Sequence, residues 1–190
     1  SVVTISGLGR WPKTASIEYF IEHCDGELPE DIRRAVVPSA PDAWMTALQR
    51  YGTMTLEEII TPALEIARDG YPLSPVVRNQ LLGETETILR WPANTEIFLR
   101  NGEVPPVGTL IVQSALARTF QRLIDVERKH SAQGREAAIG AARAEFYTGD
   151  IAQDMARYSK EQGGLLDMED FRDFHVKEEP PVRGTFREYE

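Results

Sequence analysis

Cysteine, basic clusters and long apolar runs are scarce in this chain of 190 residues, and each shortage excludes a class of protein. The single cysteine, Cys24, cannot form an internal disulfide or a cysteine-based metal cluster. A formal net charge of −9, with no basic cluster to offset it, argues against a nucleic-acid partner. No run approaches the roughly 18 apolar residues of a membrane-spanning helix, so we expect no membrane span.

Motifs of several common chemistries are also missing. The three histidines, His23, His130 and His175, lie far apart, and none has a second His or a Cys at metal-ligand spacing. The sequence contains neither a glycine-rich phosphate loop followed by Lys nor a Gly-x-Ser-x-Gly elbow. No Ser or Thr has an evident partner base. We therefore assign no catalytic residue, no metal ligand and no organic cofactor to this chain.

What the sequence does contain is helical periodicity. Hydrophobic content of 42% and charged content of 27% are typical of a globular protein. Apolar stripes and capping signals predict helices over residues 13–24, 41–51, 55–69, 74–89, 110–128, 136–147, 150–162 and 167–174. Asp167, followed by Asp170 three residues later, predicts an N-cap for the last of these helices. Residues 91–106, rich in Pro, Asn and Gly, predict a loop.

The periodicity changes at the two ends of the chain. Residues 2–6 are short, β-branched and apolar, and residues 175–179 and 182–190 also read as strands. The predicted class is therefore α+β, mostly α-helical, with strands at both ends. The chain starts without Met and stops inside a strand-like stretch, so we expect it to be an excerpt or a processed piece of a longer protein.

Arg10 is the candidate binding residue. It lies in a glycine-rich turn, residues 7–12, that leaves a strand and leads towards a helix. A guanidinium in such a turn can clamp a substrate carboxylate with two parallel hydrogen bonds. The alternative is an arginine that satisfies loop carbonyls or pairs with a nearby acid. Both interpretations stay open from the sequence alone.

Seven ordered landmarks give the chain a family resemblance. They are Gly7-Leu8-Gly9-Arg10-Trp11-Pro12, Val37-Pro38-Ser39-Ala40-Pro41-Asp42-Ala43-Trp44, residues 51–71, residues 112–117, Phe146-Tyr147-Thr148-Gly149-Asp150-Ile151-Ala152, residues 163–171 and residues 181–189. Their order resembles the gamma-glutamyltransferases, also called gamma-glutamyltranspeptidases, and their amidohydrolase relatives. The first landmark looks like a Gly-Ser-Gly-Arg-Ala-Pro turn found in many members.

The resemblance implies an N-terminal nucleophile hydrolase with a four-layer α/β/β/α core. Such enzymes are made as a precursor that cuts itself into a large and a small subunit. The small subunit begins with the catalytic Thr, whose own α-amino group can act as the base. Residues 1–190 are then expected to be the central helical portion of the large subunit. The expected partners are that small subunit and a small-molecule gamma-glutamyl or amide substrate, and the resemblance implies no cofactor.

One departure from the family pattern bears on the substrate. In gamma-glutamyltransferases an Arg four residues before the Pro of this turn holds the glutamyl α-carboxylate. Here Leu8 occupies that position, and Arg10 stands two residues before Pro12. Either Arg10 reaches the same space or the substrate differs, as in amidohydrolase and acylase branches. A non-catalytic helical scaffold is the remaining alternative, because the chain itself carries no catalytic constellation.

Overall fold

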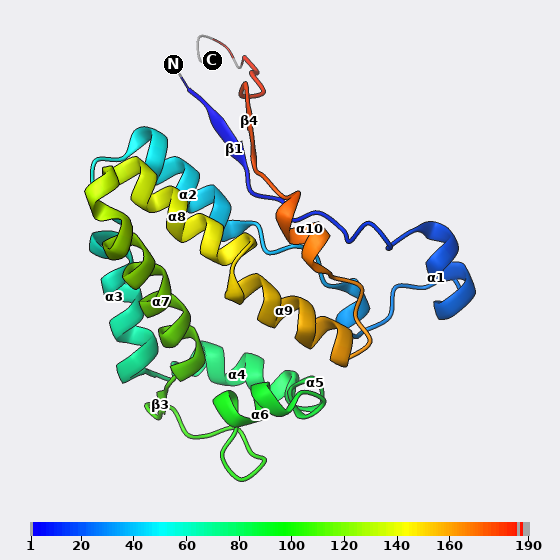
Figure 1. Ribbon diagram of the computed structural model, residues 1–190. Coiled ribbons are helices and arrows are strands. Elements are labelled where there is room, and N and C mark those ends of the chain that lie inside the picture. The colour runs from blue at the N-terminus through cyan, green and yellow to red at the C-terminus, as the bar shows by residue number, and fades with distance from the viewer. Residues whose placement is uncertain (1, 186, 188–190) are drawn as a thin grey trace. The chain divides into compact units, whose positions relative to one another are not determined.

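Most of the described chain is helical, with a few short strands (Figure 1). The computed structural model describes residues 2–185 and 187. In chain order the elements are β1 (Thr4–Ser6), α1 (Ile17–Cys24), the 3-10 helix η1 (Ile32–Arg34), α2 (Ala40–Tyr51), α3 (Leu56–Asp69), β2 (Tyr71–Pro72), α4 (Pro75–Gly83), α5 (Thr85–Leu89), α6 (Pro92–Phe98), β3 (Leu110–Ile111), α7 (Ser114–His130), the 3-10 helix η2 (Ser131–Gln133), α8 (Arg135–Tyr147), α9 (Asp150–Glu161), α10 (Met168–Arg172) and β4 (Lys177–Glu179). This architecture confirms the predicted α+β class.

The chain divides into two compact units. The first combines Ser1–Leu56 with Asp125–Glu190, and the second is Glu57–Ile124. The boundaries between them fall inside α3 and α7. The turn that carries Arg10 belongs to the first unit, together with every element that contacts it, so the first unit contains the candidate site.

In the first unit, α2 and α8 lie side by side and bury facing apolar stripes (Figure 1). Met45 and Leu48 stand one helical turn apart on α2, which places both on its buried face. The facing helix α8 contributes small alanines between larger side chains, which lets the two helices approach closely. The buried apolar residues of this unit are Val37, Met45, Leu48, Leu56, Ala138, Ile139, Ala142, Phe146, Tyr147, Ala152, Leu166, Phe171 and Phe174.

The two ends of the chain meet in this unit. β1 pairs antiparallel with β4, with Thr4 opposite Glu179 and Ser6 opposite Lys177 (Figure 1). The Thr4 hydroxyl adds a hydrogen bond to the Glu179 carbonyl at 2.7 Å. The turn that follows β1 and the segment that precedes β4 therefore lie next to each other, although more than 160 residues separate Arg10 from Asp173.

The second unit contains most of α3, the helices α4 to α6, the first part of α7 and a small strand pair. β2 pairs with β3, with Tyr71 opposite Ile111. Gly70 ends α3 at φ 92°, a conformation that glycine adopts without strain, and thereby lets the chain turn into β2. Ser74 caps α4, because its hydroxyl accepts from the Val77 amide at 3.2 Å. That cap confirms the helix start expected at Ser74.

Three sequence-based expectations for the second unit were wrong. Residues 92–98 form helix α6 instead of a loop, because Pro92 occupies the first helical turn, where its missing N–H costs no hydrogen bond. The helix expected over residues 74–89 is two helices, which end and restart around Glu84. The helix expected from residue 110 begins at Ser114, because Leu110 and Ile111 pair with β2. At residues 110–111, strand pairing with β2 therefore outweighs the local helical pattern.

At the C-terminal end the predicted strands are confirmed only in part. β4 covers Lys177–Glu179, inside the strand expected over residues 175–179. Residues 182–185 and 187 carry no strand, so the second expected strand, over residues 182–190, is wrong in that part. Positions 186 and 188–190 of that expected strand lie outside the described residues. Pro180 and Pro181 follow β4 directly, and proline cannot donate a ladder hydrogen bond.

Candidate functional site

The structure places Arg10 on the exposed turn between β1 and α1, beside the segment that leads into β4. Its Nη2 donates to the Asp173 carbonyl at 2.8 Å. Its guanidinium carbon lies 5.4 Å from the centre of the Phe174 ring, within cation–π range. One face of the guanidinium is thus engaged by the protein. A guanidinium has five N–H donors, so this engagement leaves donors for a further acceptor.

The backbone of this turn is fixed against the chain that enters α2. The Val37 amide donates to the Arg10 carbonyl at 2.9 Å. The Ser39 hydroxyl donates to the Gly7 carbonyl. At Gly9 a Cβ atom would lie 2.5 Å from the Val37 carbonyl oxygen, closer than real Cβ atoms approach. Glycine is therefore required at position 9 for the turn to lie this close to residues 36–37.

Lys13, three residues after Arg10, joins the turn to α10 through an exposed charge cluster. Its Nζ lies 2.8 Å from Glu169 Oε1 and 2.5 Å from Asp173 Oδ2. The hydrogen bonds that Lys13 donates to Asp173 and Glu169 raise the pKa of Lys13, and the bond to Asp173 lowers the pKa of that carboxyl. The side chains remain about half exposed, 50% for Lys13 and 46% for Asp173. Solvent therefore screens these charges, and such pairs contribute little to stability.

Asp170 holds the same turn through a buried contact. Asp170 is only 7% exposed to solvent. One carboxylate oxygen accepts from the Lys13 amide at 2.8 Å, and the other accepts from the Asp167 amide at 3.1 Å. Asp167 in turn accepts from the Asp170 amide, which completes a capping box at the start of α10. The expected N-cap at Asp167 is thereby confirmed.

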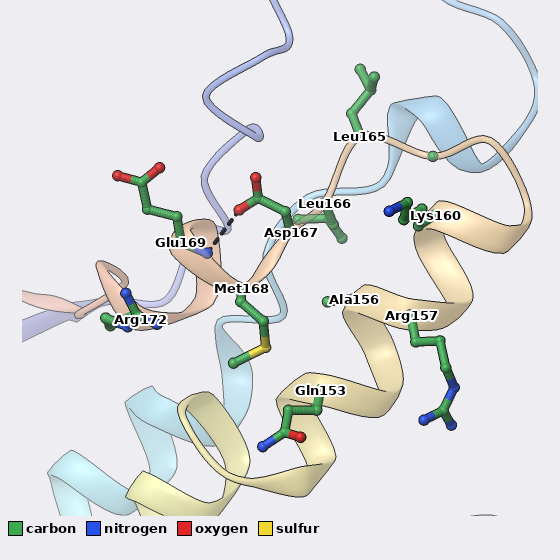
Figure 2. A pocket seen from close by; sticks show the side chains of 11 residues that line it. Gln153, Ala156, Arg157, Lys160, Leu165, Leu166, Asp167, Met168, Glu169 and Arg172 are labelled. Carbon is green, nitrogen blue, oxygen red and sulfur yellow. Dashed lines mark hydrogen bonds between the residues drawn. The ribbon is translucent and has the colours of Figure 1, made fainter.

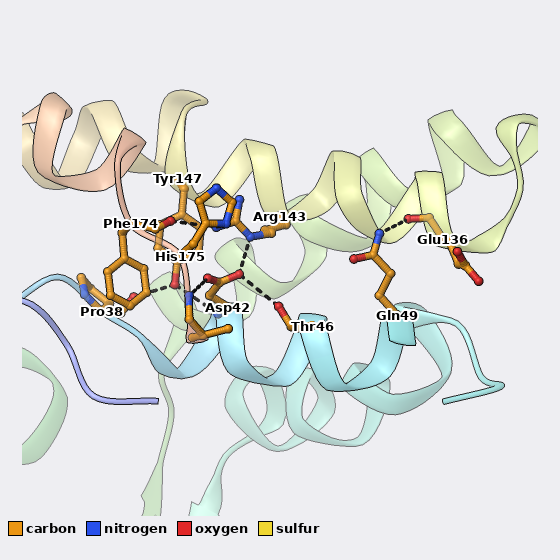
Figure 3. Close-up of polar contacts among 10 residues, drawn as sticks. Pro38, Asp42, Thr46, Gln49, Glu136, Arg143, Tyr147, Phe174 and His175 are labelled. Carbon is orange, nitrogen blue, oxygen red and sulfur yellow. Dashed lines mark hydrogen bonds and ion pairs between the residues drawn. The ribbon is translucent and has the colours of Figure 1, made fainter. Parts of the chain in front are cut away.

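A second buried carboxylate, Asp42, ties α2 to α8 and to the segment before β4 (Figure 3). Asp42 is fully buried. Its Oδ1 accepts from Arg143 Nε and, at 3.4 Å, from the Thr46 hydroxyl, and its Oδ2 accepts from the Val176 amide at 2.8 Å. A buried carboxylate needs such partners, because an unpaired charge in the interior is costly. The network therefore fixes where the chain enters β4.

Tyr147 and Arg143 complete this network from α8 (Figure 3). The Tyr147 hydroxyl donates to the Pro38 carbonyl at 2.6 Å and accepts from the Asp42 amide at 3.1 Å. Burial raises the pKa of Tyr147, so the phenol stays neutral and keeps its proton for the carbonyl. Arg143 Nη2 donates to the Phe174 carbonyl at 2.9 Å and lies 2.8 Å from His175 Nδ1. Arg143 thus holds the segment that Arg10 contacts, and the Tyr147 ring stacks on Phe174 of that segment with ring centres 5.7 Å apart.

The histidines are not brought together. His23 Nδ1 lies 3.2 Å from the Tyr19 carbonyl, and His130 Nδ1 lies 2.9 Å from the Val126 carbonyl, each one turn back on its own helix. Within residues 2–185 and 187, no group of three or more His, Cys, Asp or Glu side chains is placed to hold a metal ion. In the same range, no helix combines the length and the apolar character needed to cross a membrane.

A groove in the first unit lies between α9 and α10 (Figure 2). Its volume is about 750 Å³. Basic side chains of Arg157, Lys160 and Arg172 line it together with apolar Leu166 and Met168. Arg157 is already paired with Asp154 at 2.7 Å on its own helix. The groove is open, and Arg10 is not among its lining residues, so the candidate site remains the turn.

Sequence reasoning singled out Arg10 but missed the residues that support it. From the sequence, Asp170 is a surface or helix-start charge that follows the Asp167 cap, and Asp42, Arg143 and Tyr147 have no assigned role. Their contacts join segments more than 30 residues apart, so no local pattern reveals them. One signal was present in the sequence: Asp42, Tyr147 and Asp170 each lie within a landmark of the family resemblance.

Comparison with known proteins supports the resemblance. The family model described as gamma-glutamyltranspeptidase matches residues 1–190. The chain is 27% identical over 158 residues to the Acylase ACY 1 proenzyme of Pseudomonas sp. (strain V22), covering 83% of this chain and 26% of that protein. It is 29% identical over 154 residues to the glutathione hydrolase proenzyme of Escherichia coli (strain K12), covering 80% of this chain and 24% of that protein.

The fold matches solved structures of the same kind. The gamma-glutamyltranspeptidase of Helicobacter pylori superimposes with a TM-score of 0.80 at 23% identity, covering 99% of this chain and 54% of that chain. At this identity the match shows the fold alone. The chain spans about a quarter of the length of the two relatives, both of which are described as proenzymes.

Proposed function

Because the chain belongs to the gamma-glutamyltranspeptidase family, whose model matches residues 1–190, we propose that it is the central helical portion of a large subunit. The complete enzyme hydrolyses an amide or transfers an acyl group through an acyl-enzyme on a Thr of the small subunit. The present chain supplies the scaffold and one wall of the substrate site. The match over the whole chain carries this proposal, and the proenzyme relatives support the self-cleaving precursor.

Within this enzyme, Arg10 contacts a carboxylate of the substrate. Its turn is exposed, its backbone is fixed at Val37 and Lys13, and its guanidinium keeps donors beyond the one given to the Asp173 carbonyl. Arginine suits a carboxylate because two parallel N–H donors match the two oxygens. The Phe174 ring under the guanidinium limits its rotation, so less side-chain freedom is lost when substrate binds.

Gamma-glutamyl transfer is one form of this activity, and cleavage of a different acyl amide is the other. The second is favoured by a specific observation: Leu8, which replaces the family's carboxylate-binding Arg, is 82% exposed and apolar. The similarity to an acylase proenzyme supports it further. A substrate panel with one common leaving group, which compares gamma-glutamyl amides with amides of other carboxylate-bearing acyl groups, separates the two forms.

Self-processing is tested on the full-length gene product by an intact-mass spectrum after purification. We expect two fragments, the smaller one starting at Thr. A single uncut mass, unchanged on prolonged incubation, contradicts the enzyme proposal and favours a non-catalytic scaffold.

The role of Arg10 is tested with Arg10→Ala and Arg10→Lys in the processed enzyme. We expect Arg10→Ala to raise KM for a carboxylate-bearing substrate by about 30-fold or more, the effect of losing a charge-assisted contact of about 2 kcal/mol. Arg10→Lys restores the charge without the two-pronged geometry and should recover only part of this loss. Arg157→Ala, an exposed arginine on α9, serves as the matched control. An unchanged KM in Arg10→Ala removes Arg10 from the site.

A further inference from the structure

The segment from Asp167 to Val176 supports the Arg10 turn at two points with matching spacing. The Arg10 side chain donates to the carbonyl of Asp173, and the Lys13 amide donates to the side chain of Asp170. The two donors are three residues apart on the turn, and the two acceptors are three residues apart on α10 and its end. Two contacts separated in this way fix both the position and the rotation of the turn.

We propose that Asp170 is the positioning residue of the Arg10 turn. By accepting the Lys13 amide, its carboxylate aims the guanidinium of Arg10 at the substrate carboxylate. This inference rests on the proposed function, since it assigns Asp170 a role in the binding step rather than in stability alone. Asp170 itself touches no substrate.

Asp170 can do this because its own position is determined by α10. Its second oxygen accepts from the Asp167 amide within the capping box, so the carboxylate has little freedom to rotate. At 7% exposure its hydrogen bonds are only weakly screened by water. Bonds from amides to an ionised carboxylate are also about twice as strong as neutral ones. The Lys13 amide is therefore bound firmly to a fixed point.

The other contacts between α10 and the turn do not provide the same constraint. The Lys13 ammonium reaches Glu169 and Asp173 through a long flexible stem, and Glu169 is 63% exposed. Exposed pairs of this kind tolerate many geometries and are screened by salt. They hold the turn near α10 without setting its direction.

The far end of the segment is held independently. Asp42 accepts from the Val176 amide, six residues beyond Asp170. Loss of the Asp170 contact should therefore release the turn while leaving β4 in place. This separation makes the inference testable, because the effect of Asp170 on the turn need not be a general effect on folding.

The test uses the full-length processed enzyme in four forms. Asp170→Asn keeps the shape but replaces one carboxylate oxygen by an NH₂ group, so the side chain loses its charge and can accept from only one of the two amides of Lys13 and Asp167. Asp170→Glu keeps the charge and serves as the conservative rescue. Glu169→Gln changes the neighbouring exposed acid, whose carboxylate pairs with the Lys13 ammonium. Asp167→Ala removes the cap of α10 without removing the acceptor of the Lys13 amide.

The first readout is trypsin cleavage after Arg10 and Lys13, followed peptide by peptide, with cleavage after Lys160 in α9 as the internal reference. In Asp170→Asn we expect cleavage at the turn to accelerate about tenfold relative to Lys160, since proteolysis follows local opening. Glu169→Gln should leave the ratio unchanged. An unaltered ratio in Asp170→Asn overturns the inference.

The second readout is the division of the kinetic effect between KM and kcat. In Asp170→Asn we expect KM for the carboxylate-bearing substrate to rise about tenfold with a smaller change in kcat, and in Asp170→Glu a partial recovery. Asp167→Ala should lower stability with little effect on KM. A KM effect in Arg10→Ala but none in Asp170→Asn overturns the positioning role and leaves the proposed function standing. No KM effect in either variant removes the Arg10 contact, and the positioning role with it.

Discussion

Two charge clusters hold the same ten-residue segment of the first unit, and they differ mainly in burial. The cluster around Asp42 is interior: its carboxylate is fully buried and accepts hydrogen bonds from the Arg143 side chain and the Val176 amide. The cluster around Lys13 lies at the surface, with its side chains about half exposed. Similar chemical groups therefore act in two different dielectric environments on the segment that supports Arg10.

The difference shows which contacts determine structure. In the interior, removing one partner leaves an uncompensated charge, so the arrangement is strongly enforced. At the surface, water and salt replace a lost partner at little cost. Asp170 has features of both clusters. It is buried like Asp42, but it binds the backbone of Lys13, whose side chain belongs to the surface cluster. We expect the consequences of substitution to follow burial rather than the number of ion pairs.

The largest effect is expected for Asp42→Ala. Removal of the carboxylate leaves Arg143, whose side chain is only 18% exposed, without its acid and leaves the Val176 amide without an acceptor. The apparent free energy of unfolding, from urea denaturation, should fall by about 3–5 kcal/mol. Asp42→Asn, which keeps one acceptor, should lose less. If Asp42→Ala lowered the free energy of unfolding no more than a substitution in the exposed cluster, burial would not distinguish the two clusters.

Tyr147→Phe should have the next largest effect. The substitution keeps the buried ring but removes the hydroxyl that joins the Pro38 carbonyl to the Asp42 amide. Leaving these groups without their partner should cost about 1–3 kcal/mol in urea denaturation. Tyr158→Phe, on a tyrosine that is 43% exposed, is the matched control and should be nearly neutral. Equal losses in the two variants would contradict a buried network at Tyr147.

The surface cluster should be visible in the pH dependence of stability. The hydrogen bond from Lys13 lowers the pKa of Asp173, and outside this cluster the hydrogen bond from Arg33 likewise lowers the pKa of Asp31. As pH falls, the unfolded chain therefore binds protons on these groups before the folded chain does. Their contribution is present above the ordinary aspartate pKa and is lost as pH falls below about 4. Thermal denaturation of Asp173→Asn should show a flatter acid decline than the parent, and an identical decline would exclude this contact as its source.

The smallest effect is expected for Glu169→Gln. Glu169 is 63% exposed, and its partner Lys13 retains Asp173. The denaturation midpoint should not change measurably at physiological salt, because exposed ion pairs are screened. A midpoint shift comparable with that of Tyr147→Phe would show that solvent exposure does not determine how much each contact contributes to stability.

The sequence predicted the helices better than it predicted their partners. The broad apolar face of α3 and the signals at Ser74 and Asp167 are local, and the structure confirms the helix starts at Ser74 and Asp167. α6 was missed because proline and asparagine favour loops on average, although Pro92 is compatible with a first helical turn. The β2–β3 pair was missed because each strand is two residues long and depends on its partner.

In the candidate site, too, the sequence predicted the local feature but not the long-range contacts. Arg10 was found because a glycine-rich turn with an arginine is a local pattern. Asp170 and Asp42 were not recognised as its supports, because their contacts span 157 and 134 residues of sequence. Tertiary packing determines which carboxylate accepts from an amide so far away in the sequence. Periodicity and motif spacing are local and carry no information about such a pair.

The most direct test of the account is a double-mutant cycle of Arg10→Ala and Asp170→Asn on KM for a carboxylate-bearing substrate. If Asp170 acts only by aiming Arg10, its substitution has nothing further to remove once Arg10 is absent. We expect the KM of the double variant to equal that of Arg10→Ala within about twofold, which is a strong coupling between the two positions. Effects that multiply, as for independent sites, would contradict it.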